Sequence, residues 1–172
     1  MTHQRDRIQD AVADNPGIHF NELKRVLDLG TGQAQYHLRQ LETEDNVISE
    51  SLYGRTHYYT PEYGEWERGA IAVLRRETAC DVLVYLISNG PSTPGSVAGG
   101  LNIARSTVEW HLDHLVEQEL VTKERNARND VTLVIDHPEE TAEMLQAVDP
   151  SLANRLADRF TRLVDGLLDP SD

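Results

Sequence analysis

The feature that most constrains the fold of this chain is an internal repeat with an offset of 74 residues. The shift places Gln35-Tyr36-His37-Leu38 on Glu109-Trp110-His111-Leu112. Apolar positions repeat under the same shift: Ile8 with Val82, Val12 with Leu86, Leu23 with Val97, Leu27 with Leu101, Leu41 with Leu115 and Val47 with Val121. A repeated apolar pattern predicts two copies of one structural unit. A chain of 172 residues can bury two small cores of this kind.

The first copy has the pattern of three helices followed by a β-hairpin. Helical spacing predicts helices around Ile8 to Val12, over residues 20–27, and from Ala34 to Leu41, with turns at residues 15–17 and 29–32. Alternation predicts strands over residues 47–52 and 56–60 around Tyr53-Gly54-Arg55. This order is typical of a winged helix-turn-helix unit. The second copy repeats it with helices over 77–88, 93–101 and 105–117 and strands over 121–125 and 131–135.

The fold class that follows is mainly α with small β-hairpins, an α+β arrangement of two tandem winged helix-turn-helix domains with C-terminal helices. We expect a first winged domain over residues 1–62, a linker helix over 63–76, a second winged domain over 77–136 and C-terminal helices over 137–172. The last of these helices carries an apolar stripe at steps of three and four residues: Leu152, Leu156, Phe160, Leu163 and Leu167. Such a stripe needs a partner surface. We expect a homodimer interface, with packing on the second winged unit as the alternative.

The charge of the chain is acidic, with 16 Lys and Arg against 29 Asp and Glu and a formal net charge of −13. Only Lys24 and Lys123 are lysines. Scarce lysine with abundant carboxylate resembles the proteomes of halophilic archaea, where the acidic surface reflects adaptation to salt. Molar salt screens the long-range field within a few ångströms, so the total charge says little about partners. The start of the chain is charged and no apolar run has the length of a membrane span, which predicts a soluble cytoplasmic protein.

The two predicted third helices, residues 32–42 and 105–116, look like recognition helices of ArsR/MarR-type winged regulators. Tandem versions are similar to haloarchaeal helix-turn-helix transcriptional regulators, and the resemblance covers about residues 3–60 and 77–135. It implies a sequence-specific DNA-binding regulator with double-stranded DNA as partner. Neither copy has the cysteine metal box of some ArsR members, so we expect no metal and no cofactor. The single cysteine, Cys80, is expected to lie in the core.

The candidate DNA contacts follow from the helix faces. With Ala34, Leu38 and Leu41 turned inward, the outward residues of the first copy are Gln33, Gln35, Tyr36, Arg39 and Gln40. Glutamine can read adenine, and arginine can read guanine or hold a phosphate. At the wing, Arg55 and His57 are candidates for backbone or minor-groove contact.

The second copy offers a different set of residues. Its outward helix residues Ser106, Thr107 and Trp110 and its wing residues Arg125 and Arg128 are further candidates. Glu109 and Asp113 stand beside them, and carboxylates repel phosphates. Two interpretations stay open: one carboxylate accepts from a cytosine amino group, or the second unit docks protein.

Other functions have less support in the sequence. No nucleophile elbow, phosphate loop or HExxH motif is present, which predicts a non-enzyme. His37 and His111 flank the core faces as partly buried residues, and His111 with His114 is too small a set for a metal site. A winged-helix protein that binds only other proteins is the main alternative. A ligand-responsive repressor is another, with an effector cavity near Trp66, Tyr85 and Phe160.

Overall fold

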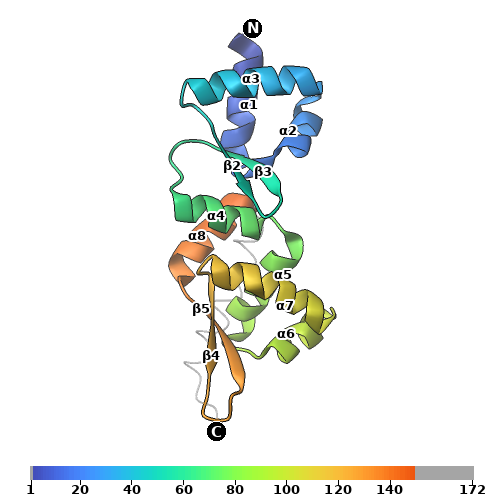
Figure 1. Cartoon of the computed structure of the whole chain (residues 1–172), viewed down its shortest axis with the longest axis vertical. Coiled ribbons are helices and arrows are strands. Elements are labelled where there is room, and N and C mark those ends of the chain that lie inside the picture. Colours follow the sequence, from blue (N-terminus) through green and yellow to red (C-terminus); the bar gives the residue numbers. More distant parts are fainter. Residues whose placement is uncertain (1, 150–172) are drawn as a thin grey trace, which may run out of the picture. The chain divides into compact units, whose positions relative to one another are not determined.

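The computed structural model describes residues 2–149 and divides into two compact units, Met1–Ala72 and Val73–Asp172 (Figure 1). The C-terminal residues expected at a dimer interface, Leu152, Leu156, Phe160, Leu163 and Leu167, lie outside the described residues. Within residues 2–149, no helix combines the length and the apolar character needed to cross a bilayer.

The first unit consists of three helices, a small antiparallel sheet and the first eight residues of a fourth helix. Its elements are α1 (Thr2–Asp14), β1 (Ile18–His19), α2 (Phe20–Leu27), α3 (Thr31–Thr43), β2 (Ile48–Leu52), β3 (Arg55–Tyr59) and the start of α4 (Glu65–Leu74). The strand order is β1-β3-β2, and β2 and β3 form the hairpin. Asp28 ends α2 in the left-handed conformation (φ 52°), which allows the chain to turn into α3 three residues later.

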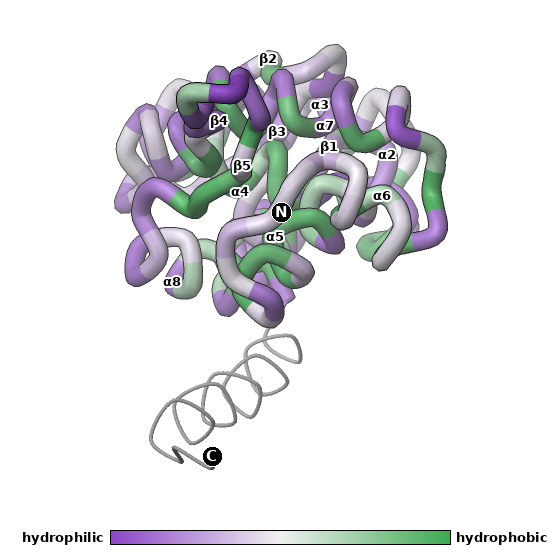
Figure 2. The backbone as a smooth tube through the Cα atoms, turned by 90° about the horizontal axis from the view of Figure 1, so that it is seen from below, coloured by the Kyte–Doolittle hydropathy of each residue, from purple (hydrophilic) through white to green (hydrophobic). Residues whose placement is uncertain are grey.

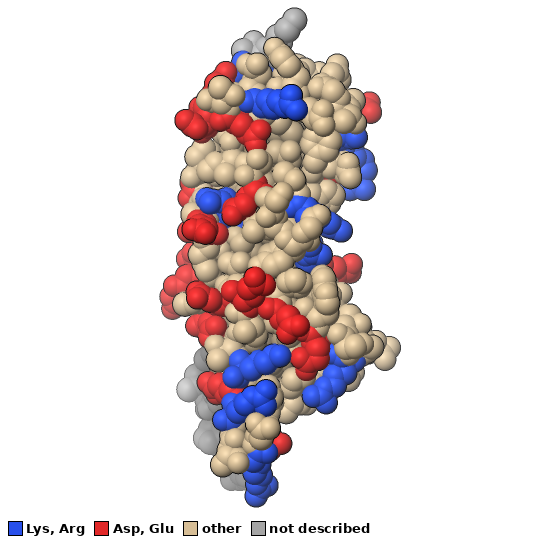
Figure 3. Space-filling view, in the orientation of Figure 1, with Lys and Arg blue, Asp and Glu red and all other residues tan. Residues whose placement is uncertain are grey.

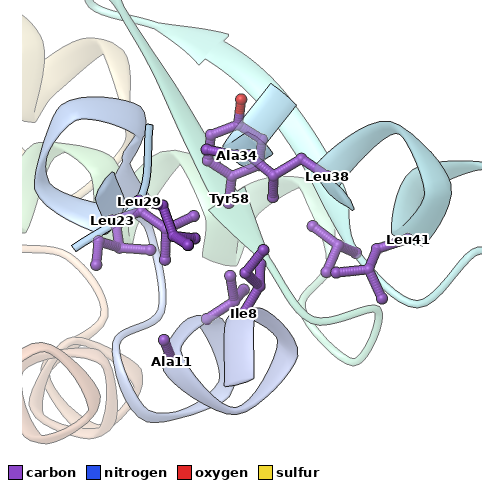
Figure 4. Close-up of a cluster of buried hydrophobic side chains, with 11 residues drawn as sticks. Ile8, Ala11, Leu23, Leu29, Ala34, Leu38, Leu41 and Tyr58 are labelled. Atoms are coloured by element: carbon purple, nitrogen blue, oxygen red, sulfur yellow. The ribbon is translucent and has the colours of Figure 1, made fainter. Parts of the chain in front are cut away.

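The core of the first unit lies between its three helices and β3. Figure 4 shows Ile8 of α1, Leu23 of α2, Leu38 and Leu41 of α3, and Tyr58 of β3 pointing toward one another. All five are buried. Each large aliphatic side chain removed from water in this way contributes roughly 1.5–3 kcal/mol to stability. This packing fixes which face of α3 is turned inward.

The second unit has the same order of elements. It contains α5 (Glu77–Asn89), α6 (Pro94–Leu101), α7 (Arg105–Glu117), the antiparallel pair β4 (Val121–Arg125) and β5 (Val131–Ile135), and α8 (Pro138–Val148). Thr93 caps α6, because its Oγ1 accepts from the backbone N–H of Ser96 at 3.1 Å. Asn102 ends α6 in the left-handed conformation, as Asp28 does for α2. The trace of α5 is largely hydrophobic in Figure 2, and Val82, Leu83 and Leu86 of this helix are buried.

The predicted fold class, mainly α with small hairpins in a winged helix-turn-helix order, is confirmed. Sequence analysis missed β1, which is only two residues long and pairs with β3 through Ile18 opposite Tyr58 and His19 opposite His57. A strand of two residues is too short to show alternation of apolar and polar residues, so the sequence pattern does not predict it. In the second unit an isolated bridge between Ser92 and Leu133 connects the loop before α6 to β5.

Candidate nucleic-acid interface

The outward face of α3 is polar and open to solvent. Gln33, Gln35 and Arg39 are exposed, Tyr36 is 59% exposed, and Gln40 is half-buried. The helical period of 3.6 residues separates these side chains from the buried residues Ala34, Leu38 and Leu41. Among the described residues, no carboxylate forms an ion pair with the Arg39 guanidinium. Arg39 is therefore available to a partner molecule.

The N-terminal end of α3 is held by contacts that sequence analysis did not anticipate. The side-chain oxygen of Gln33 accepts from the backbone N–H of Gly30 at 3.4 Å. Lys24 of α2 donates to Thr31 Oγ1 at 2.8 Å, and its ammonium lies 5.4 Å from the centroid of the Phe20 ring. Gln33 thus satisfies a backbone N–H at the N-terminal end of α3, and Lys24 places a positive charge beside this end. The signal for Lys24 was its rarity as one of two lysines, in the helix before the turn.

The wing of the first unit is a tight hairpin with Arg55 at its tip. Leu52 pairs with Arg55 across the two-residue loop Tyr53-Gly54, and both loop residues have positive φ (51° and 81°). Two such residues form the turn that matches the twist of antiparallel strands, and glycine adopts it without strain. Arg55 is exposed at this turn. The hairpin therefore presents one arginine to solvent.

His57 is a correction to the expected DNA contacts. Its side chain is 2% exposed, and its Nδ1 donates to the carbonyl of Gly17 at 2.6 Å. The strand β1 lies against β3 at this position, with His19 opposite His57. β1, which the sequence did not indicate, covers the edge of β3 at this position, so that edge is not open to solvent. We therefore remove His57 from the candidate interface.

The corresponding helix of the second unit has the opposite charge on its outer face. Under the repeat, Gln35, Arg39 and Thr43 of α3 correspond to Glu109, Asp113 and Glu117 of α7. Residues at steps of four share one face of a helix. Asp113 and Glu117 are exposed, and Figure 3 shows acidic side chains across the surface of α7.

The N-terminal half of α7 is closer to neutral. Lys123 of β4 lies 3.3 Å from Glu109, and Arg105 lies 4.0 Å from the same carboxylate. Ser106 and Thr107 are exposed, and Trp110 is 50% exposed. The repulsive charge on α7 is therefore concentrated at Asp113 and Glu117.

The hairpin of the second unit is basic. Its basic residues are Lys123 and Arg125 on β4 and Arg128 in the turn, and both arginines are exposed; Figure 3 shows Lys and Arg side chains along this hairpin. Its tip is ordered by Asn126, whose side-chain oxygen accepts from the backbone N–H groups of Arg128 and Asp130, both at 2.9 Å. Arg125 also donates to Asn129 Oδ1 at 3.1 Å. The second wing thus presents two arginines beside an acidic helix.

The exposed indole of Trp110 lies among groups that carry or can acquire positive charge. The Arg76 guanidinium is 5.7 Å from its ring centroid, and the rings of His111 and His114 lie at 4.8 and 4.4 Å. Burial lowers the pKa of His111 below its ordinary value, and the charges of Arg76 and His114 lower it further. His111 therefore stays neutral in the folded protein at pH values where an exposed histidine is partly protonated.

We predict that the second unit loses stability as the pH falls below about 6.5, the ordinary histidine pKa. The unfolded chain binds a proton at His111 more readily than the folded chain does, so this contribution is present above that pH and is lost on acidification. Urea unfolding from pH 8 to pH 5 measures the effect. A His111→Gln chain is expected to show a shallower fall, and an equal fall in both chains would rule out His111 as the cause.

Three other features considered from the sequence are a metal site, the single cysteine and an effector cavity. Among residues 2–149, no three His, Cys, Asp or Glu side chains gather as a metal site would require. Cys80 is buried in α5. Of the three aromatic residues considered for an effector cavity, Tyr85 lines a hollow in the second unit, Trp66 does not, and Phe160 lies outside the described residues.

Comparison with known proteins adds to the evidence from α2 and α3. Residues 2–71 match the sequence model of a family described as an N-terminal HTH domain. Residues 2–71 are therefore similar to a helix-turn-helix (HTH) domain, and α2, the turn at residues 28–30 and α3 have that arrangement. The chain is also 28% identical, over 136 residues, to the uncharacterized HTH-type transcriptional regulator MJ1398 of Methanocaldococcus jannaschii. That match covers 79% of this chain and 34% of the relative, so the chain spans about a third of the relative's length. The similarity to this relative extends beyond residues 2–71, because it covers 136 residues of the chain.

One solved structure, that of disulfide-formed AbfR, aligns over 80% of this chain and 96% of its own. The TM-score is 0.37 and the sequence identity is 16%. Agreement at this level does not indicate a shared fold.

Proposed function

We propose that this chain is a sequence-specific DNA-binding transcriptional regulator whose α3 enters the major groove while the β2–β3 wing lies on the backbone. One observation carries the proposal: α3 turns Gln35, Tyr36 and Arg39 to solvent on a single face, with the Arg39 guanidinium unpaired by any carboxylate of the described residues. In helix-turn-helix proteins the second helix of the motif reads base edges in this way.

Each residue on this face has a chemical role in the proposal. Arg39 can donate two hydrogen bonds to guanine, and Gln35 can pair with adenine through its amide. Tyr36 presents a phenol that can donate to a phosphate. Lys24, beside the N-terminal end of α3, and Arg55, on the wing, supply positive charge on either side of the reading face. These contacts act over hydrogen-bond distances.

The net charge of −13 opposes DNA binding only over long distances. The Debye length is about 10 Å at 0.1 M salt and about 3 Å at 1 M, so high salt confines electrostatic effects to neighbouring groups. At contact range the exposed residues of the α3 face are Gln33, Gln35, Tyr36 and Arg39. None of these four residues is acidic. The proposal therefore predicts that specific binding is retained at salt concentrations that abolish non-specific binding.

Fluorescence anisotropy with the DNA upstream of the chain's own gene, against a scrambled duplex, tests this function. The titration is repeated from about 0.2 M to molar KCl, because salt governs protein–DNA affinity. Preference for the upstream duplex that persists as salt rises supports a sequence-specific regulator. Equal affinities at every salt concentration would contradict the proposal and favour a module that binds only protein.

For the second unit, we propose a second winged helix-turn-helix fold that serves mainly as a protein-docking surface. Its α7 presents Asp113 and Glu117 where α3 has Arg39 and Thr43, and phosphates in a groove would be repelled by those carboxylates. The exposed Trp110 beside them is typical of an interface residue. DNA contact by this unit is the second candidate, and the exposed Arg125 and Arg128 of its wing favour it.

We predict that Asp113→Arg gives the second unit measurable non-specific affinity for DNA. The change places on α7 the residue that α3 has at the equivalent position and replaces a repulsive charge by an attractive one. Anisotropy at low salt with a scrambled duplex measures it, and the affinity is expected to fall steeply as salt rises. Glu143→Arg, with the same change of charge at an exposed position of α8, is the matched control. Equal gains in both variants would mean that total charge, rather than the α7 face, decides binding.

A further inference from the structure

A hollow of about 760 Å³ lies on the second unit beside α5. Leu74, Val84 and Leu101 give it apolar walls, and the ring of Tyr85 lines it as well. Gly100 of α6 lies so close to this ring that a Cβ there would be 2.2 Å from Cε2. The absence of a side chain at Gly100 thus allows Tyr85 its position, and the apolar walls are already formed in the described part of the chain.

One side of the hollow is acidic. Glu77 and Asp81 stand four residues apart on α5, where like charges repel each other, and Asp149 also lines the hollow. Arg75 is the one basic residue of the described lining, so the three carboxylates outnumber it. Burial raises the pKa of Asp81, and the neighbouring charge of Glu77 raises it further. A cationic side chain placed here would relieve this repulsion. The hollow therefore suits a partner that is apolar along one stripe and basic along its flank.

The chain itself contains such a segment, and it begins at the hollow. Val148 and Asp149, the last described residues, line the hollow, and residue 150 follows directly. The segment carries the apolar stripe from Leu152 to Leu167 identified from the sequence. At helical spacing Arg155, Arg159 and Arg162 follow one flank of that stripe.

We propose that residues 151–168 pack into this hollow of their own chain, with the apolar stripe on Leu74, Val84 and Leu101 and the arginines facing Glu77 and Asp81. Leu152 follows Asp149 by three residues, so its side chain can reach the hollow within about 10 Å of chain. A tethered segment has an effective concentration in the millimolar range, which favours the same chain over a second copy. This assignment replaces the dimer contact that the stripe alone suggested.

The single cysteine provides the experiment, because Cys80 lines the same hollow. In the full-length chain, Phe160→Asp is expected to raise the rate of Cys80 alkylation by a maleimide by about tenfold or more. Thr161→Asp adds the same charge one position away from the stripe and is expected to leave the rate near that of the wild type. Light scattering on the same samples gives the mass of each species, and circular dichroism reports folding.

A second pair of variants keeps the apolar stripe intact. Arg159→Glu is expected to speed Cys80 alkylation, and Asp81→Arg in the same chain is expected to slow it again. The proposal is overturned if Phe160→Asp and Arg159→Glu both react at the wild-type rate. It is also overturned if the wild type is a dimer that Phe160→Asp converts to a monomer, because the stripe would then pair between copies.

Discussion

Replacing Arg39 with alanine is expected to lower the affinity for specific DNA by about 5- to 150-fold, which corresponds to the roughly 1–3 kcal/mol of a bidentate contact to a base. Arg39 is exposed on the reading face of α3 and forms no ion pair within the described residues. Its removal therefore leaves the fold unchanged and takes away only an intermolecular contact. Anisotropy with specific and scrambled duplexes measures the loss, which should be larger for the specific duplex.

Arg128→Ala is the matched control for this prediction. It removes the same charge from an exposed site, but from the tip of the second hairpin. If only the first unit contacts DNA, Arg128→Ala binds like the wild type. Equal affinities of the wild type and Arg39→Ala for the specific duplex would exclude α3 of the first unit from the interface, whatever the control shows.

Replacing Leu38 with alanine is expected to lower the free energy of unfolding of the first unit by about 2–5 kcal/mol, the cost of a cavity in a close-packed core. Leu38 is 2% exposed and lies on α3 opposite the reading face. A domain of about 70 residues has only roughly 4–10 kcal/mol of stability in total. The change would therefore remove a large share of the stability of the first unit, and specific DNA binding would be lost at a lower temperature than in the wild type.

Leu112→Ala makes the equivalent change in the second unit, where Leu112 is fully buried in α7. Differential scanning calorimetry and urea unfolding compare the two variants. We expect Leu38→Ala to lower the temperature at which specific DNA binding is lost, and Leu112→Ala to leave that temperature unchanged while destabilising the second unit. If Leu112→Ala lost specific binding and Leu38→Ala kept it, the DNA contact would lie on the second unit, which contradicts the proposed function.

The helical parts of this fold could be predicted because their apolar residues recur at a fixed period. Ala34, Leu38 and Leu41 fixed the buried face of α3, and the exposed face followed by exclusion. The same argument applied to Val108, Leu112 and Leu115 of α7. Gln33, three residues after Gly30, had the spacing of a capping interaction, yet its role was visible only once the helix boundary was known.

Contacts between distant parts of the chain were not predictable in this way. Burial of His57 depends on Gly17 and on β1, which lie 38 or more residues earlier in the sequence. The pairing of Lys123 with Glu109 joins β4 to α7 through the register of the hairpin, which no local pattern specifies. The contact of His57 with Gly17 removes His57 from the candidate site. The pairing of Lys123 with Glu109 reduces the negative charge on the N-terminal half of α7.

The two units show how one core pattern can support two surfaces. Leu38 and Leu112 occupy equivalent buried positions, whereas the next outward residues are Arg39 and Asp113. A core residue is constrained by packing on all sides, but an exposed residue is constrained only by its partner. The difference between Arg39 and Asp113 is therefore the main basis for assigning the two units different partners.

The most direct test of the central claim is an NMR comparison of backbone amide signals with and without the upstream DNA duplex. We expect the largest chemical-shift changes on residues 31–43 and on the β2–β3 turn, with small changes on residues 105–117. Shifts concentrated on residues 105–117, with α3 unaffected, would contradict this claim and would place the reading surface in the second unit.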